Sequence, residues 1–127
     1  MVYPESAPFT DWMGVTLLSG EVGKVRLQLV QRGDLNNRRG VVHGGVLATL
    51  LDSAMARSAR SLADGMELGG TVDLHVQFMK PAKGTLIATG TVESSSRTLA
   101  FCRGEVRDVH HVLVAAATAT MRLRRTV

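Results

Sequence analysis

Residues able to do chemistry gather in one short stretch of the chain. Asn37 precedes the sequence His43-Gly44-Gly45, and Asp52 follows it within a mostly apolar segment. Paired glycines at the start of a helix leave backbone N–H groups uncovered, and the helix dipole adds roughly half a positive charge there. We expect an oxyanion to be stabilised at this point, with the Gly44 N–H best suited to the role. The alternative is that the two glycines only allow close packing of the helix.

Asp52 stands nine residues after His43. At about 100° and 1.5 Å per residue, that spacing puts it on the opposite side of the helix and roughly 13 Å further along. One helix therefore cannot present both to one small reacting centre. If both serve one reaction, the most economical geometry is a two-fold dimer that combines Gly44 of one subunit with Asp52 of the other. The alternative is a solvated Asp52 paired with Arg57 or Arg60.

The elements around these residues follow from the periodicity of the apolar positions. A helical stripe begins at Val46 and runs to about Leu62. Alternation predicts a two-stranded hairpin over residues 15–30 and, after the helix, a meander of four strands ending near residues 78, 94, 107 and 123. The last three are expected at 85–94, 98–107 and 111–123. This pattern predicts an α+β fold with the helix against one face of an antiparallel sheet.

Length and composition set broader limits. With 127 residues, 45% hydrophobic and 20% charged, the chain is expected to fold as a single domain over 1–127. The N-terminal residues lack the features of a signal peptide, and Cys102 has no partner for an internal disulfide, so a cytoplasmic location is expected. No uncharged run is long enough to span a membrane. The net charge of +4 favours anionic partners, but with 4% aromatic residues and no interleaved arginines, nucleic-acid binding is not expected.

Three stretches together resemble a known family. Residues 37–45 followed by Leu50-Leu51-Asp52-Ser53-Ala54 are similar to the hotdog-fold acyl-CoA thioesterases of the phenylacetate-degradation (PaaI-like) family. Residues 70–82 and 97–101 are similar to it as well, so the resemblance runs from about residue 37 to 123. It implies one long central helix packed against an antiparallel sheet of five to six strands. It also implies an acyl-CoA substrate, and a homodimer or homotetramer with sites at the dimer interface.

The resemblance further implies roles for individual residues. Asp52 would attack the thioester or activate water, and the Gly44 N–H would polarise the thioester carbonyl. Asn37 would orient the carbonyl or the water, and the Thr71 hydroxyl would hold the water or the carboxylate. His43 either fixes the start of the helix or takes part in the chemistry. Gly45 is expected to contribute to substrate binding, and no metal or cofactor is required.

Other polar residues have two interpretations each. Asp73 is a reserve candidate for the catalytic carboxylate, because alternation puts it with His75 and Thr71 on the polar face of one strand. Basic side chains late in the chain either meet the phosphates of CoA or form a solvated rim; these are Arg97, Arg122, Arg124 and Arg125. Three residues receive structural interpretations. His110 and His111 lack ligand partners, and Cys102 is expected to be a small buried hydrophobe.

The competing functions are a non-catalytic acyl-CoA-binding hotdog protein, a hotdog dehydratase and a nucleic-acid-binding protein. Pure binding has no need of a carboxylate such as Asp52 in an apolar setting. The His-containing Pro/Gly-rich motif of hotdog dehydratases is not found, and neither is a helix-turn-helix or finger pattern. An acyl-CoA thioesterase is therefore the leading hypothesis, with aryl, phenylacetyl-like and medium-chain acyl groups all left open.

Overall fold

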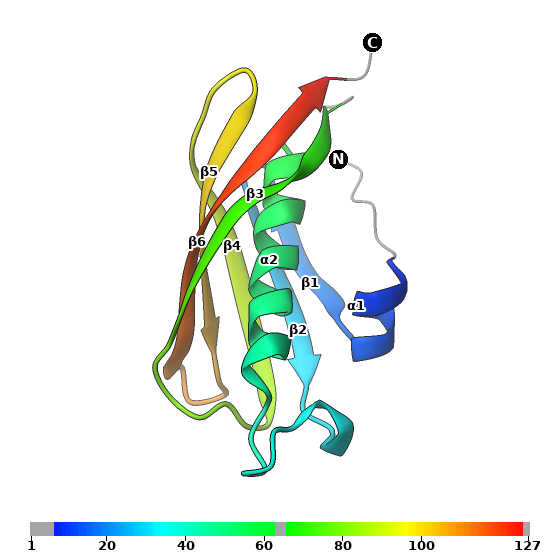
Figure 1. The fold of residues 1–127 in the computed structure, drawn as a ribbon, viewed down its shortest axis with the longest axis vertical. Coiled ribbons are helices and arrows are strands. Elements are labelled where there is room, and N and C mark those ends of the chain that lie inside the picture. The colour runs from blue at the N-terminus through cyan, green and yellow to red at the C-terminus, as the bar shows by residue number, and fades with distance from the viewer. Residues whose placement is uncertain (1–6, 63–65, 126–127) are drawn as a thin grey trace.

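Six antiparallel strands form one sheet, and a long helix lies against one of its faces (Figure 1). The computed structural model describes residues 7–62 and 66–125. The strands occur in the order β1-β2-β4-β5-β6-β3. The α+β architecture expected from the sequence is confirmed. In chain order the elements are α1 (Pro8–Met13), β1 (Thr16–Glu21), β2 (Lys24–Val30), η1 (Gly33–Leu35), α2 (Gly44–Arg60), β3 (Met66–Phe78), β4 (Thr85–Ser95), β5 (Leu99–Arg107) and β6 (Leu113–Arg125).

The predicted four-strand meander is wrong in one connection. β3 pairs with β6 at the edge of the sheet, whereas β4 lies between β2 and β5. The turn at residues 81–84 reverses the chain direction, but the two strands that it joins do not pair with each other. The sequence could not predict this, because alternation indicates which face of a strand is buried and not which strand lies beside it. The β1–β2 hairpin is confirmed. β6 begins at Leu113, later than predicted, because His111 has a φ of 62° and belongs to the preceding turn.

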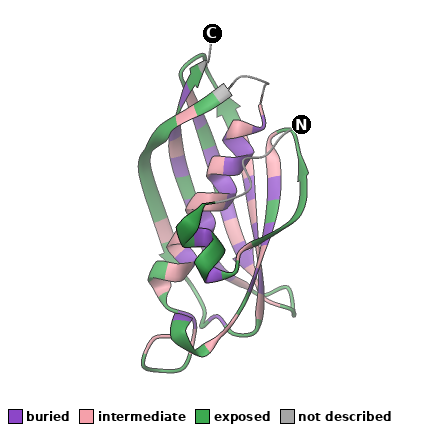
Figure 2. Ribbon diagram, turned by 90° about the vertical axis from the view of Figure 1, so that its right-hand side faces the viewer, coloured by how far each residue is buried: buried purple, intermediate pink, exposed green. Residues whose placement is uncertain are grey.

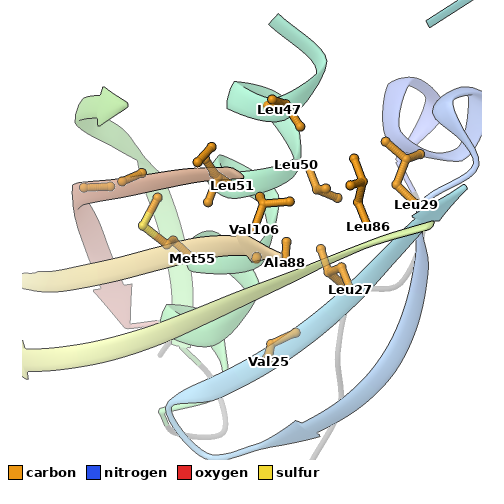
Figure 3. Packing of buried hydrophobic residues seen from close by; sticks show 14 of the residues in the cluster. Val25, Leu27, Leu29, Leu47, Leu50, Leu51, Met55, Leu86, Ala88 and Val106 are labelled. Atoms are coloured by element: carbon orange, nitrogen blue, oxygen red, sulfur yellow. The ribbon is translucent and has the colours of Figure 1, made fainter. Parts of the chain in front are cut away.

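Close packing of α2 against the middle of the sheet determines where the helix lies. An ideal Cβ on Gly90 of β4 would lie 2.4 Å from the carbonyl of Ala54 in α2, so the helix backbone rests directly on this strand. On β5, a Cβ on Gly104 would meet the side chain of Leu51 at 3.1 Å. Figure 3 shows Leu50, Leu51 and Met55 of α2 pointing into the apolar core that forms there. No helix within 7–62 and 66–125 has the length and apolar character needed to cross a membrane.

Two loops meet at the end of the molecule where α2 begins (Figure 1). The Val42 N–H donates to the carbonyl of Ala82 at 2.9 Å, which joins the segment before α2 to the β3–β4 connection. The His43 N–H donates to the carbonyl of Leu35, also at 2.9 Å. Ala82, Val42 and Leu35 are all buried. The start of α2 is therefore held in a frame of backbone hydrogen bonds and apolar contacts.

The contact at Gly90 makes a direct prediction. Replacing Gly90 by Ala should lower the free energy of unfolding by roughly 1–3 kcal/mol, because the new methyl group meets helix backbone that cannot rotate away. The measurement is chemical denaturation followed by circular dichroism. Gly33→Ala is the matched control, since nothing lies within 4 Å of a Cβ at that position. Equal changes in the two variants would contradict the proposed role of the Gly90 contact.

Candidate functional site

The His43 side chain caps the N-terminus of α2. Its Nδ1 atom accepts a hydrogen bond from the Gly45 N–H at 2.8 Å, which satisfies one of the unpaired donors of the first turn. A Cβ on Gly45 would lie 3.0 Å from the same nitrogen, so the glycine leaves room for the imidazole. The structure thus places His43 where it fixes the start of the helix. The Gly45 N–H is held by this cap, and the expected contribution of Gly45 to substrate binding stays a prediction.

Gly44, by contrast, keeps its N–H uncovered. Among the described residues this N–H has no acceptor, and it stands at the first position of α2. Gly44 lines a cavity of about 580 Å³ together with Asn37 and Phe78. A Cβ on Gly44 would lie 3.3 Å from the Phe78 ring, so a side chain here would crowd the ring. A free helix N–H that lines a cavity is suited to bind a carbonyl oxygen that gains negative charge.

Asn37 contributes a second donor to the same cavity. Its Oδ1 atom accepts hydrogen bonds from the Arg39 N–H at 2.9 Å and from the Val41 N–H at 3.4 Å, which closes the turn over residues 37–41. Its Nδ2 group has no acceptor within the described part of the chain. The two ends of the amide thus have different roles, because the oxygen holds the loop while the NH₂ group is left for a ligand.

Asp52 and Thr71 form the polar pair of the site. The Thr71 hydroxyl donates to Asp52 Oδ1 at 2.7 Å, which joins the middle of α2 to the edge strand β3. Asp52 is half-buried. One carboxylate oxygen is thereby oriented by the hydroxyl, and Oδ2 makes no hydrogen bond to another described residue. The structure brings together these two predicted residues, which lie 19 positions apart in the sequence.

A β-bulge aims Thr71 at the helix. In the pairing of β3 with β6, Thr71 lies opposite Met121 and Asp73 lies opposite Thr120, so Val72 is an extra residue. Met121 is fully buried beneath α2, and Thr71 therefore points to the helix face of the sheet. Without the bulge, strict alternation would turn the Thr71 hydroxyl away from Asp52.

The bulge also overturns the expectation for Asp73. This residue and His75 pair with Thr120 and Thr118, whose side chains lie on the face of the sheet turned away from α2. Asp73 Oδ1 accepts a hydrogen bond from the Thr120 N–H at 3.1 Å. Asp73 is thus on the opposite face of the sheet from Asp52 and Thr71, and its carboxylate is held by backbone next to the bulge.

Within one chain, Gly44 and Asp52 line different cavities. Asp52 lines a smaller one of about 290 Å³, shared with Phe9 of α1 and Thr49 of α2. None of the ion pairs among the described residues involves Asp52, so its expected alternative pairing with Arg57 or Arg60 is not found there. The structure therefore gives two half-sites on one helix, with the free Gly44 N–H in one and the Asp52 carboxylate in the other.

The late arginines lie away from the Gly44 half-site in the same chain. Figure 1 shows the β4–β5 turn, which contains Arg97, and the end of β6 at the opposite end of the molecule from the start of α2. Arg122 and Arg124 alternate with the buried Met121 and Leu123, so they face away from α2. The β6 residue Arg125 pairs in register with Met66 at the same end.

Three cationic residues that the sequence analysis did not single out line the Gly44 cavity instead. They come from the two loops at the start of α2. Their positive charge beside predicted turns was the feature of the sequence that could have identified them. They are Arg39, Lys80 and Lys83.

Cys102 and the histidine pair are not part of either half-site. Burial raises the pKa of the Cys102 thiol to about 11, so this side chain is a poor nucleophile at neutral pH. His110 and His111 lie in the exposed β5–β6 turn. No cluster of three or more potential metal ligands occurs in the described portion of the chain.

Comparison with known proteins gives consistent results. The thioesterase superfamily profile matches residues 39–115, which is more than half of the chain. A putative esterase of Halobacterium salinarum is 33% identical over 95 residues, covering 71% of this chain and 63% of that protein. Human acyl-coenzyme A thioesterase 13 is 33% identical over 89 residues, covering 68% of this chain and 63% of that protein. The chain thus spans just under two thirds of the length of both relatives.

The same architecture occurs among solved structures. The PaaI protein of the Escherichia coli phenylacetic acid degradation operon superposes with a TM-score of 0.85, over 95% of this chain and 86% of that one, at 20% identity. At this level of identity the likeness shows the fold alone, and it confirms the hotdog architecture expected from the sequence.

Proposed function

The chain belongs to the thioesterase superfamily, and we propose that it hydrolyses an acyl-CoA thioester to a carboxylic acid and free CoA. The observation that carries the proposal is the 2.7 Å hydrogen bond between Thr71 and Asp52, which leaves Oδ2 of the carboxylate as the reactive atom. Human acyl-coenzyme A thioesterase 13, one of the similar proteins, supports the choice of substrate class. Asp52 thus acts on the thioester, and Gly44 and Asn37 hold its carbonyl oxygen.

Completing this site requires a second copy of the chain. β3 is a 13-residue edge strand with no neighbour on its outer side in the described structure, and Figure 2 shows it as a largely exposed band. Val72 and Phe78 are 54% and 56% exposed on it. The other edge strand, β1, has six residues and a bulge at Leu18, features that discourage pairing. β3 is therefore the edge through which two chains pair.

The register of that pairing follows from the two half-sites. Phe78 lies beside Gly44, and the Thr71 hydroxyl is hydrogen-bonded to Asp52. Gly44 of one chain and Asp52 of its partner therefore come together when Phe78 of the first chain lies opposite Thr71 of the second. With Val72 counted as the bulge residue, His75 is three pairing positions from each. An antiparallel two-fold dimer with His75 at the axis meets this condition. Gly44 of each chain then shares a site with Asp52 of the partner subunit.

Asp52 Oδ2 can take part in thioester hydrolysis in two ways, as a general base or as a nucleophile. In the general-base route, Asp52 Oδ2 removes a proton from water as the water oxygen bonds to the carbonyl carbon. The C–S bond then breaks, and the proton passes to the departing thiolate. In the nucleophilic route, Oδ2 itself bonds to the carbonyl carbon, CoA thiolate leaves, and water hydrolyses the resulting anhydride. In both, the Gly44 N–H stabilises the tetrahedral oxyanion.

Removing the carboxylate tests this chemistry. Asp52→Asn keeps the acceptor for Thr71 but should lower kcat for thiol release from acyl-CoA by roughly 10²- to 10⁴-fold. Asp73→Asn is the matched control and should retain activity, because this carboxylate lies on the other face of the sheet. The assay is release of CoA across aryl, phenylacetyl and medium-chain substrates. Unchanged kcat in Asp52→Asn would remove Asp52 from the mechanism, and a wild type that binds acyl-CoA without hydrolysis would favour the non-catalytic alternative.

The two-fold axis predicts a specific cross-link. His75→Cys should form an intermolecular disulfide under mild oxidation, because directly opposed β-strand residues have Cβ atoms about 4.5–5.5 Å apart. Gln77→Cys should not, since the two copies would lie about 13 Å apart along the strands. The native Cys102 is buried and does not compete. A non-reducing gel measures the outcome, and efficient cross-linking of the Gln77 variant alone would show that the register is wrong.

Mixed dimers test whether each site is composite. Asn37→Asp keeps the Oδ1 acceptor of the turn while losing the NH₂ donor, so it should be inactive without unfolding the loop. A purified heterodimer of one Asn37→Asp chain and one Asp52→Asn chain should recover about half of the wild-type activity, because one of its two sites has neither lesion. Heterodimers as inactive as the two parents would place the whole site within a single chain.

A further inference from the structure

Gln31 stands directly after β2, and its side chain makes three hydrogen bonds. The Nε2 group donates to Asn36 Oδ1 at 2.9 Å and to the Gly40 carbonyl at 3.2 Å. The Oε1 atom accepts from the Gly84 N–H at 2.8 Å. The NH₂ group and the carbonyl oxygen of this amide are therefore both engaged, although the residue is only half-buried.

The two donor bonds hold the turn that presents Asn37. Asn36 and Gly40 lie on either side of Asn37 in the loop before α2, so one amide group contacts the loop both before and after it. Hydrogen bonds within residues 37–41 shape this turn without attaching it to another element. In the described part of the chain, the bond from Gln31 to Gly40 is the one hydrogen bond that reaches residues 37–41 from outside them. The direction of Asn37 Nδ2 therefore depends on Gln31.

The acceptor bond joins the same side chain to the second loop at the start of α2. Gln31 continues the pairing of β2 with β4, and its N–H donates to the Gly84 carbonyl at 3.0 Å. Main chain and side chain of Gln31 thus bind the two polar groups of one residue. Gln31 itself is not among the residues that line the Gly44 cavity. Any effect of Gln31 on a ligand must therefore pass through the loops that it holds.

We infer that Gln31 is a positioning residue, whose side-chain amide fixes the turn over residues 37–41 against the end of β2 so that Asn37 Nδ2 faces the Gly44 cavity. The inference rests on the proposed function, in which Asn37 holds the thioester carbonyl oxygen. A donor aligned before the substrate arrives acts most strongly in the transition state, when that oxygen gains charge. Displacing such a group by about 1 Å can cost on the order of 10²-fold in rate.

Gln31→Met tests the inference, because methionine has a similar length and removes all three side-chain hydrogen bonds. It should lower kcat for thiol release by roughly 10- to 100-fold and leave KM within about twofold of the wild-type value. Ser61→Ala is the matched control. The Ser61 hydroxyl accepts from the Gly23 N–H at 2.8 Å and so joins another loop to the other end of α2. This variant should keep the wild-type kcat, and thermal melts check that both variants are folded in the assay.

A double variant separates positioning from a general loss of stability. In the Asn37→Asp chain the NH₂ donor is already absent, so adding Gln31→Met should change the residual kcat, measured with concentrated enzyme, by less than about twofold. Losses that multiply in the double variant would overturn the inference. So would an unchanged kcat in Gln31→Met, or an equal loss in Ser61→Ala.

Exchange of backbone amides with water separates this inference from the proposed function. The Arg39 and Val41 N–H groups donate to Asn37 Oδ1, so their exchange, followed by NMR, should be roughly 10-fold faster in Gln31→Met and unchanged in Ser61→Ala. If the wild type hydrolyses no thioester but the two amides respond in this way, the proposed function fails and the role of Gln31 in holding the turn stands. Unchanged exchange in Gln31→Met overturns the inference, whatever the activity.

Discussion

Contact between the backbone of α2 and β4 at Gly90 sets the geometry on which the rest of the molecule depends. Because a Cβ would lie 2.4 Å from the Ala54 carbonyl, the helix can rest this close to the sheet only where the strand has no side chain. Asp52 is two residues from this contact, and Gly44 is ten residues away at the start of the same rigid helix. Once the contact is made, both of these positions in the proposed site are fixed relative to the strands.

The bulge at Val72 in β3 brings a hydroxyl group to this fixed helix. A regular β3 would place Thr71 on the same face as Asp73, away from the carboxylate that it binds. The bulge at Val72 interrupts the alternation between Thr71 and Asp73. Val76 therefore packs against the core, and the Thr71 hydroxyl still points toward α2. Bulges near functional positions often serve to re-aim a side chain in this way.

The sequence predicted those features that depend on local pattern. The 3.6-residue period identified α2, alternation identified all six strands, and the residues around His43-Gly44-Gly45 indicated a helix start with chemical capacity. It did not predict that β3 leaves its sequence neighbour β4 and pairs with β6, because partner choice depends on the packing of the whole sheet. The bulge was equally hidden, since Thr71-Val72-Asp73 has no glycine or proline to mark it. The assignment of Asp73 and Thr71 to one face failed for that reason.

The hydrogen bond from Val42 to Ala82 has a consequence for the thermodynamics of ligand binding. It ties together the two loops that line the Gly44 cavity, and the Asn37 turn and the His43 cap hold the adjoining backbone on either side. A ligand that enters therefore meets a backbone that is already ordered. Little conformational entropy of the main chain is lost on binding. The entropy that is lost comes mainly from ordering the long side chains of Arg39, Lys80 and Lys83, which line the cavity. Affinity at this end of the molecule is then governed by how many contacts form, and substitutions that loosen the two loops would weaken binding without removing a single one of those contacts.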